Sequence, residues 1–147
     1  MKKHVEIFEK IIRLLNKINQ SNKIPRDYGT GHILHQSEIH TIEAIKNHEN
    51  VKASELSSIL AITNGALTQA ISKLKKKGLV DQYNTIGNKK DVYYRLTDKG
   101  EIANLGHDKH HKEAYKNLNQ YIESLEDDKI EIINAFLEKL INNWPHN

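Results

Sequence analysis

Two groups of residues in this 147-residue sequence have the types and spacing to do chemistry. The first is the segment 63–77, in which Asn, Thr and Gln come first, Lys follows, and no acidic residue occurs. Such a polar and then cationic surface suits base edges flanked by phosphates. The second group is a set of nine histidines, six of which fall in two clusters. Imidazole nitrogens bind Zn²⁺ well, so these clusters suggest a metal site.

The segment 63–77 has the spacing of a helix with one apolar stripe. The stripe is Leu67, Ala70, Ile71 and Leu74. Thr63 is the expected N-cap, and Gly78 is expected to end the helix because glycine tolerates positive φ. Taken alone, the segment fits better with a solvated surface helix whose lysines favour the helix dipole. The neighbouring elements favour DNA binding.

The histidine clusters lie about 70 residues apart in the chain. They are His32, His35 and His40, and His107, His110 and His111. His107 and His111 are four residues apart, so their rings share one face of a helix and can converge on one cation. The alternative is a set of surface histidines, because such pairs also occur by chance.

The stretch 107–111 superficially resembles the HExxH motif of zinc hydrolases. Asp108 would stand where that motif has its glutamate. Aspartate is one methylene shorter, and no downstream ligand is obvious, so a zinc-dependent hydrolase is the remote alternative.

Composition and charge narrow the class of protein. The sequence has no apolar run long enough to span a membrane, no signal-peptide core and no cysteine, which favours a cytoplasmic protein without disulfides. The net charge of +3 is unevenly distributed: residues 51–100 carry +5 and residues 101–147 carry −4. A basic centre with an acidic C-terminal third indicates an anionic partner for the centre alone.

The elements around segment 63–77 predict a mainly α fold with a small β wing. Periodicity predicts helices at 2–19, 38–47, 53–60, 63–77, 98–123 and 127–142, a loop at 21–31, and strands at 79–83 and 91–96. A helix-turn-helix followed by a two-stranded wing is a winged helix-turn-helix domain. The apolar stripes of the first and last two helices are wider than this domain can cover. They predict a homodimer, which would match a palindromic site.

At this point the sequence resembles the MarR family of bacterial transcriptional regulators. The resemblance rests on Ser-Glu-Leu at 54–56, the run at 68–80 and Leu-Thr-Asp-Lys-Gly at 96–100. It implies a non-enzymatic homodimer that binds double-stranded DNA with its recognition helix in the major groove. It also implies three parts: an N-terminal dimerisation helix and loop (1–34), the winged domain (35–100) and C-terminal dimerisation helices (101–147).

The resemblance and the pattern together give a set of expected DNA contacts. On the recognition helix they are Asn64, Gly65, Thr68, Gln69, Ser72, Lys73 and Lys76, and on the wing Asn88, Lys89 and Lys90. The wing residues match an Asp-x-Arg turn whose arginine enters the minor groove. Lysine is more strongly hydrated than arginine, so Lys90 should exploit a narrow groove less well.

The zinc-responsive branch of the MarR family implies a ligand set for the histidines. His40, His107 and His111 match its three histidines, and Asp27 is the acid nearest to its glutamate. The second site of that branch uses a cysteine, which this chain lacks. A small organic effector bound near Tyr28 and Tyr115 is the alternative to zinc.

Overall fold

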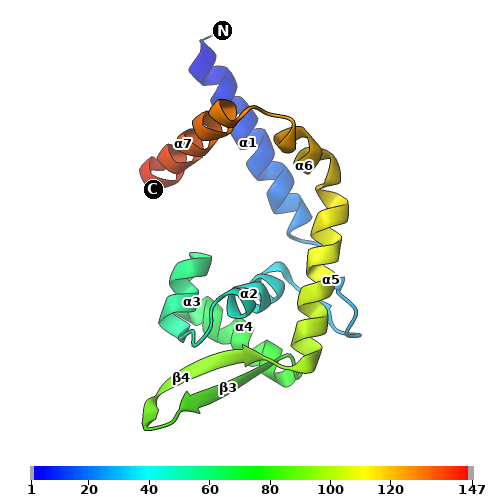
Figure 1. Cartoon of the computed structure of the whole chain (residues 1–147), viewed down its shortest axis with the longest axis vertical. Coiled ribbons are helices and arrows are strands. Elements are labelled where there is room, and N and C mark those ends of the chain that lie inside the picture. The colour runs from blue at the N-terminus through cyan, green and yellow to red at the C-terminus, as the bar shows by residue number, and fades with distance from the viewer. Residues whose placement is uncertain (1, 146–147) are drawn as a thin grey trace. The chain divides into compact units, whose positions relative to one another are not determined.

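A computed structural model describes residues 2–145 of the chain, which are mainly helical with two small antiparallel sheets (Figure 1). The elements are α1 (Lys3–Ser21), β1 (Arg26–Asp27), β2 (Ile33–Leu34), α2 (Gln36–Asn47), α3 (Ala53–Leu60), α4 (Asn64–Lys76), β3 (Val80–Thr85), β4 (Asn88–Leu96), α5 (Asp98–Ala114), α6 (Lys116–Glu123) and α7 (Asp127–Asn143). The helix-turn-helix and wing predicted from the sequence are confirmed: α3 and α4 precede the hairpin β3–β4.

The core of the winged domain forms where α2, α3 and α4 pack together. Its most buried side chains come from all three helices and from the strands and connecting residues beside them: Leu34, Ile39, Ile42, Val51, Leu56, Leu67, Leu74, Leu79 and Val80. The predicted stripe of α4 is the part of that helix that is buried. The Thr63 hydroxyl accepts a hydrogen bond from the Ala66 N–H at 3.1 Å, and Gly78 adopts a φ of +72°, so both ends of α4 agree with the prediction.

The wing is an antiparallel hairpin that is fixed to the helices at its base. Val80 pairs with Leu96, and Tyr94 forms an isolated bridge with Val51. The Thr97 hydroxyl accepts from the Gly100 N–H and donates to the Gly78 carbonyl at 2.6 Å. One side chain therefore caps α5 and joins its start to the end of the recognition helix.

The start of α2 differs from the prediction. The helix begins at Gln36, with His35 as its N-cap, instead of at Glu38 with Ser37 as the cap. The carboxylate of Glu38 reaches back and accepts the His35 N–H at 3.2 Å. A glutamate three residues after the N-cap stabilises the helix start in this way, which explains the earlier beginning.

Two further features were not predicted. The helix expected at 98–123 is two helices, because Tyr115 leaves helical geometry (φ −102°, ψ +8°) between α5 and α6. One irregular residue hardly disturbs the apolar spacing, so periodicity does not reveal it. Part of the loop expected at 21–31 forms the strand β1, which pairs with β2 in the register of Arg26 with Leu34.

The described chain divides into two compact units, one up to Asp108 and one from Lys109 onward. No residue of α1, α6 or α7 is buried, and all three helices lie wholly within the described residues. Within residues 2–145, no helix has both the length and the apolar character needed to cross a membrane.

Candidate nucleic-acid interface and metal centre

The outward face of α4 carries the residues predicted to contact DNA. All seven of them are exposed: Asn64, Gly65, Thr68, Gln69, Ser72, Lys73 and Lys76. The Thr68 hydroxyl donates to the Asn64 carbonyl at 2.8 Å, which fixes its orientation and leaves its oxygen able to accept. The face therefore offers amide and hydroxyl groups in its first two turns and cations in its last turns.

The four lysines at the end of this helix have different surroundings. Lys75 donates to the Gln82 side chain at 2.7 Å, and Lys77 forms an ion pair with Glu38 at 2.7 Å. Lys73 and Lys76 form no ion pair with any residue between 2 and 145. The ammonium groups of Lys73 and Lys76 are therefore available to bind an anion from outside the domain.

The wing tip is held by a network around Asn88. Its side-chain oxygen accepts from the Lys90 and Asp91 N–H groups at 3.1 and 3.2 Å, and its nitrogen donates to the Asp91 carboxylate at 2.8 Å. Asn88 was expected as a DNA contact, but its amide is engaged within the turn. Lys89 and Lys90 are exposed, and the tip residue Ile86 is fully exposed.

Asp91 connects this tip to the start of α3. Its carboxylate lies 3.2 Å from the Lys52 ammonium. The hydrogen bond from Asn88, followed by that from Lys52, lowers the pKa of Asp91 below its ordinary value. The same ion pair raises the pKa of Lys52. The wing tip and the helix-turn-helix are therefore joined by a charged contact.

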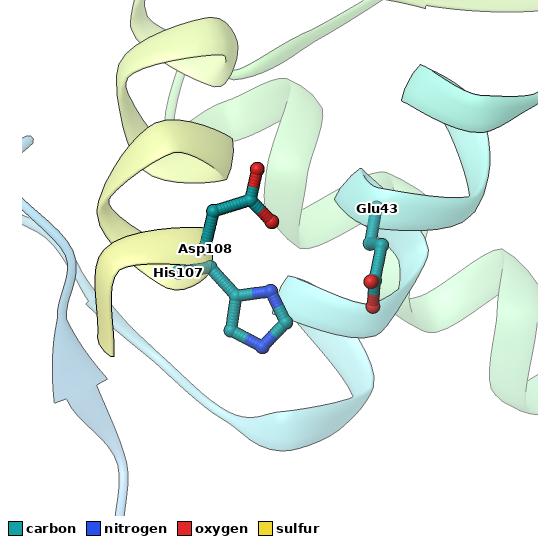
Figure 2. A group of neighbouring side chains, drawn as sticks. All are labelled: Glu43, His107 and Asp108. Atoms are coloured by element: carbon teal, nitrogen blue, oxygen red, sulfur yellow. The ribbon is translucent and has the colours of Figure 1, made fainter. Parts of the chain in front are cut away.

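A second candidate site lies between α2 and α5. One possible ligand atom from each of Glu43, His107 and Asp108 can be chosen so that all three atoms lie within 4.8 Å of one another. Figure 2 shows the His107 ring and the Asp108 carboxylate extending from α5 toward α2, which carries Glu43. His107 is buried, Glu43 is half-buried and Asp108 is exposed. One imidazole and two carboxylates suit a divalent cation such as Zn²⁺, with a fourth position for another ligand.

Of the ligands expected from the sequence, two lie close to each other. The ring of His40 has its centroid 5.9 Å from that of His107, near the roughly 5 Å that two imidazoles on one tetrahedral zinc require. The ring of His111 packs edge-on against Tyr115 at 5.1 Å, in the second unit. Neither His40 nor His111 belongs to the group formed with Glu43.

Asp27, the fourth expected ligand, organises the turn between β1 and β2. One of its carboxylate oxygens accepts the N–H groups of Gly29, Thr30 and Gly31 at 2.8, 3.0 and 3.2 Å. These bonds, led by that from Gly29, lower the pKa of Asp27. Sequence reasoning missed Glu43, and it named Asp108 only in the hydrolase alternative and not as a metal ligand. Their signal was their position, three residues after His40 and one after His107.

Residues 34–92 match the sequence profile of the MarR family. The match covers less than half of the chain. The chain is 29% identical to the HTH-type transcriptional regulator PchR of Bacillus subtilis over 102 residues, which cover 69% of this chain and 60% of PchR. The chain therefore aligns with less than two thirds of that relative.

Solved structures share the fold of the MarR domain and of the helices around it. Streptococcus pneumoniae FabT, solved in complex with DNA, superimposes with a TM-score of 0.72 at 22% identity, covering 95% of this chain and 96% of FabT. Lactococcus lactis ZitR, described as a zinc-responsive MarR family member, superimposes with a TM-score of 0.66 at 19% identity, covering 95% and 99%. The predicted winged helix-turn-helix fold is confirmed.

Proposed function

We propose that this chain is a transcriptional regulator that binds a palindromic site in double-stranded DNA as a homodimer. The observation that carries the proposal is the exposed face of α4, which has no acidic residue and ends in two lysines without an internal counter-charge. Two similar proteins support it: PchR, which is named as a transcriptional regulator, and FabT, which has the same fold and was solved in complex with DNA.

Each part of the surface has a distinct role in this proposal. Asn64, Gly65, Thr68 and Gln69 contact base edges or adjacent phosphates, because they occupy the first turns of the helix that enters the major groove. Ser72, Lys73 and Lys76 contact phosphates. Lys89 and Lys90 contact DNA from the wing. Asn88 acts by holding the turn in which the two lysines lie.

The dimer is proposed from α1, α6 and α7. The three helices expose 15 large apolar side chains of the described chain, including Phe8, Ile12, Leu118, Phe136 and Leu137. Exposed apolar helix faces of this extent mark an interface. The occupant is a second copy, since a two-fold dimer presents two α4 helices to the two halves of a palindrome. Residues 1–34 and 101–147 thus serve dimerisation, and residues 35–100 serve DNA binding.

The salt dependence of DNA binding tests the interface. Each phosphate contact that is lost should reduce the slope of log K against log salt by about one unit, whatever the DNA sequence. We expect this reduction for Lys73→Ala and for Lys90→Ala, measured by fluorescence anisotropy with the DNA upstream of the protein's own coding sequence. Lys139→Ala, in α7 outside the MarR domain, should leave the slope unchanged. Unchanged slopes in all three variants would remove the two lysines from the interface.

We further propose that a divalent metal ion, with zinc the best match to the donor set, regulates DNA binding. Glu43, His107 and Asp108 supply the observation that favours this function, and ZitR gives a zinc-responsive protein of the same fold. His107 is common to this group and to the set expected from the sequence, so it should be required in either arrangement.

The organic-effector alternative has less support: Tyr28 is buried against the ring of His107, and Tyr115 belongs to the second unit.

Zinc titration separates the two ligand sets. The protein is first stripped of metal with a chelator, and Zn²⁺ binding is then measured by competition with a chromogenic chelator. We expect His107→Gln to weaken Zn²⁺ binding by more than tenfold. If Glu43→Gln loses Zn²⁺ binding and His111→Gln retains it, the ligands are the group of Glu43, His107 and Asp108. The reverse pattern favours the set of His40, His107 and His111. His4→Gln, on α1, is the control. If His107→Gln binds zinc as tightly as the unaltered chain, the metal proposal is wrong.

A further inference from the structure

A pocket of about 370 Å³ lies between the start of α2 and the end of α4. It is lined by His32, His35, Glu38, Lys73, Lys76 and Lys77. Five of these side chains can donate hydrogen bonds and only one is acidic. All six belong to the first compact unit, and neither the proposed DNA contacts nor the metal group accounts for the two histidines.

The single carboxylate in the pocket is already neutralised. Glu38 is 1% exposed, and its Oε2 forms the 2.7 Å ion pair with Lys77. Its Oε1 accepts the His35 N–H, while the Lys77 ammonium also donates to the Ile33 carbonyl at 3.0 Å. One buried side chain thus fixes both walls of the pocket. It does not oppose an anion, because its charge is balanced by Lys77.

The remaining charges of the lining are positive. Lys73 and Lys76 are three residues apart, so they project from one face of α4, and neither has a counter-ion among residues 2–145. Like charges at this spacing repel each other, and an anion between them would remove that repulsion. His32 and His35 add N–H donors, and the partial positive charge at the start of α2 acts in the same direction.

We propose that this pocket is a binding site for a phosphate group. A phosphate carries several strong acceptor oxygens around one atom, which matches donors that converge from two helices and a loop. The group has two possible sources: a phosphodiester of the DNA lying along α4, or a small phosphorylated molecule. The first source rests on the proposed DNA-binding function, and the second does not.

Titration with inorganic phosphate tests the site. The full chain is followed by NMR of its histidine ring resonances at constant ionic strength, with chloride as the replaced anion. We expect saturable shifts for His32 and His35. Each of His35→Gln and Lys76→Gln should weaken phosphate binding by about tenfold, as expected for a charge-assisted hydrogen bond worth about 1.4 kcal/mol. Circular dichroism establishes that the variants are folded.

Two controls distinguish a built pocket from general attraction to a basic surface. Lys75→Gln removes the same charge from the same turn of α4, but Lys75 bonds to Gln82 and does not line the pocket. His48→Gln changes an exposed histidine at the other end of α2. Both should bind phosphate like the unaltered chain. The absence of saturable shifts, or equal weakening by Lys75→Gln and Lys76→Gln, would overturn the proposal.

Addition of duplex DNA then identifies the source of the phosphate. If DNA displaces inorganic phosphate, the pocket receives the DNA backbone. If both remain bound, or if DNA does not bind, the pocket serves a small phosphorylated molecule. Loss of DNA binding with phosphate binding intact contradicts only the proposed function. Absence of both DNA binding and phosphate binding contradicts both proposals. DNA binding by a chain that does not bind phosphate contradicts only the pocket.

Discussion

At position 106 the backbone of α5 lies against the backbone of the loop between α1 and α2. A Cβ atom at Gly106 would overlap the carbonyl oxygen of Tyr28. Tyr28 in turn packs edge-on against His107, with ring centroids 5.4 Å apart. The absence of a side chain at position 106 therefore places the loop beside the proposed metal ligand.

Gly106→Ala should destabilise the protein by about 1–3 kcal/mol, because the loop must shift to admit the methyl group. Chemical denaturation measures the free energy of unfolding. Gly65→Ala is the matched control: its Cβ would meet no atom within 4 Å, and alanine favours a helix over glycine by up to about 1 kcal/mol. A Gly106→Ala protein as stable as Gly65→Ala would show that the close approach is not required.

The wing tip should respond to acid through Asp91. Its pKa is lowered by the hydrogen bond from Asn88 and then by Lys52, so its contribution to stability is present above the ordinary aspartate pKa. That contribution is lost as pH falls through the lowered pKa of the folded state. We expect amide exchange in Lys90 and Asp91 to accelerate in acid beyond the intrinsic change, and the Asp91→Asn variant to show no such step. Identical profiles for the two proteins would count against the contact.

Individual side chains were the least predictable part of the site. The sequence supplied the exposed residues of α4 because helical spacing separates a polar face from an apolar one. It could not supply Glu43 as a neighbour of His107, since the two are 64 positions apart and meet only through the packing of α2 on α5. Asp27 was expected near a metal because of a family resemblance, and the structure places its carboxylate in a turn.

At the scale of elements, one buried ion pair joins α2 to the end of the recognition helix. Lys77→Met would leave the Glu38 carboxylate buried without its partner and should cost about 3 kcal/mol of unfolding free energy. The double variant Lys77→Met with Glu38→Gln should recover part of this loss because the uncompensated charge is gone.

An exposed ion pair provides the comparison. Lys46 and Glu101 lie 2.9 Å apart, but both are more than 40% exposed, so Lys46→Met should cost less than about 1 kcal/mol. Equal losses for Lys46→Met and Lys77→Met would mean that the buried pair does not hold the two helices together.

Most elements were predictable because their signals are local. The N-cap Thr63 and the positive-φ Gly78 each act within a few residues, and both behave as predicted. The start of α2 was misplaced because a glutamate three residues away outweighed a serine at the expected cap. The two glycines of α5, which weaken a helix in isolation, are required by contacts with distant segments.

At the scale of the whole molecule, the apolar faces of α1 and α7 should decide the oligomeric state. Phe8→Glu and Phe136→Glu each place a charge on an exposed apolar face and should convert dimers to monomers at micromolar concentration, measured by analytical ultracentrifugation. The melting temperature of the unaltered protein should rise with concentration. Ile86→Glu makes the same kind of change at the fully exposed wing tip and should leave the mass unchanged. A monomeric unaltered chain would contradict the proposed dimer.

The lack of any buried residue in α1, α6 and α7 also bears on the life of a newly made chain. In a chain that has not yet formed the proposed dimer, these helices contribute no side chain to a buried core, so they can unfold locally and be cut by a cellular protease. The rate of dimerisation depends on the square of the monomer concentration, whereas the rate of monomer degradation depends on its first power. At a low rate of synthesis most chains would then be degraded before they dimerise, whereas at a high rate most would form stable dimers. Proteolysis would therefore set a threshold rate of synthesis below which little regulator accumulates.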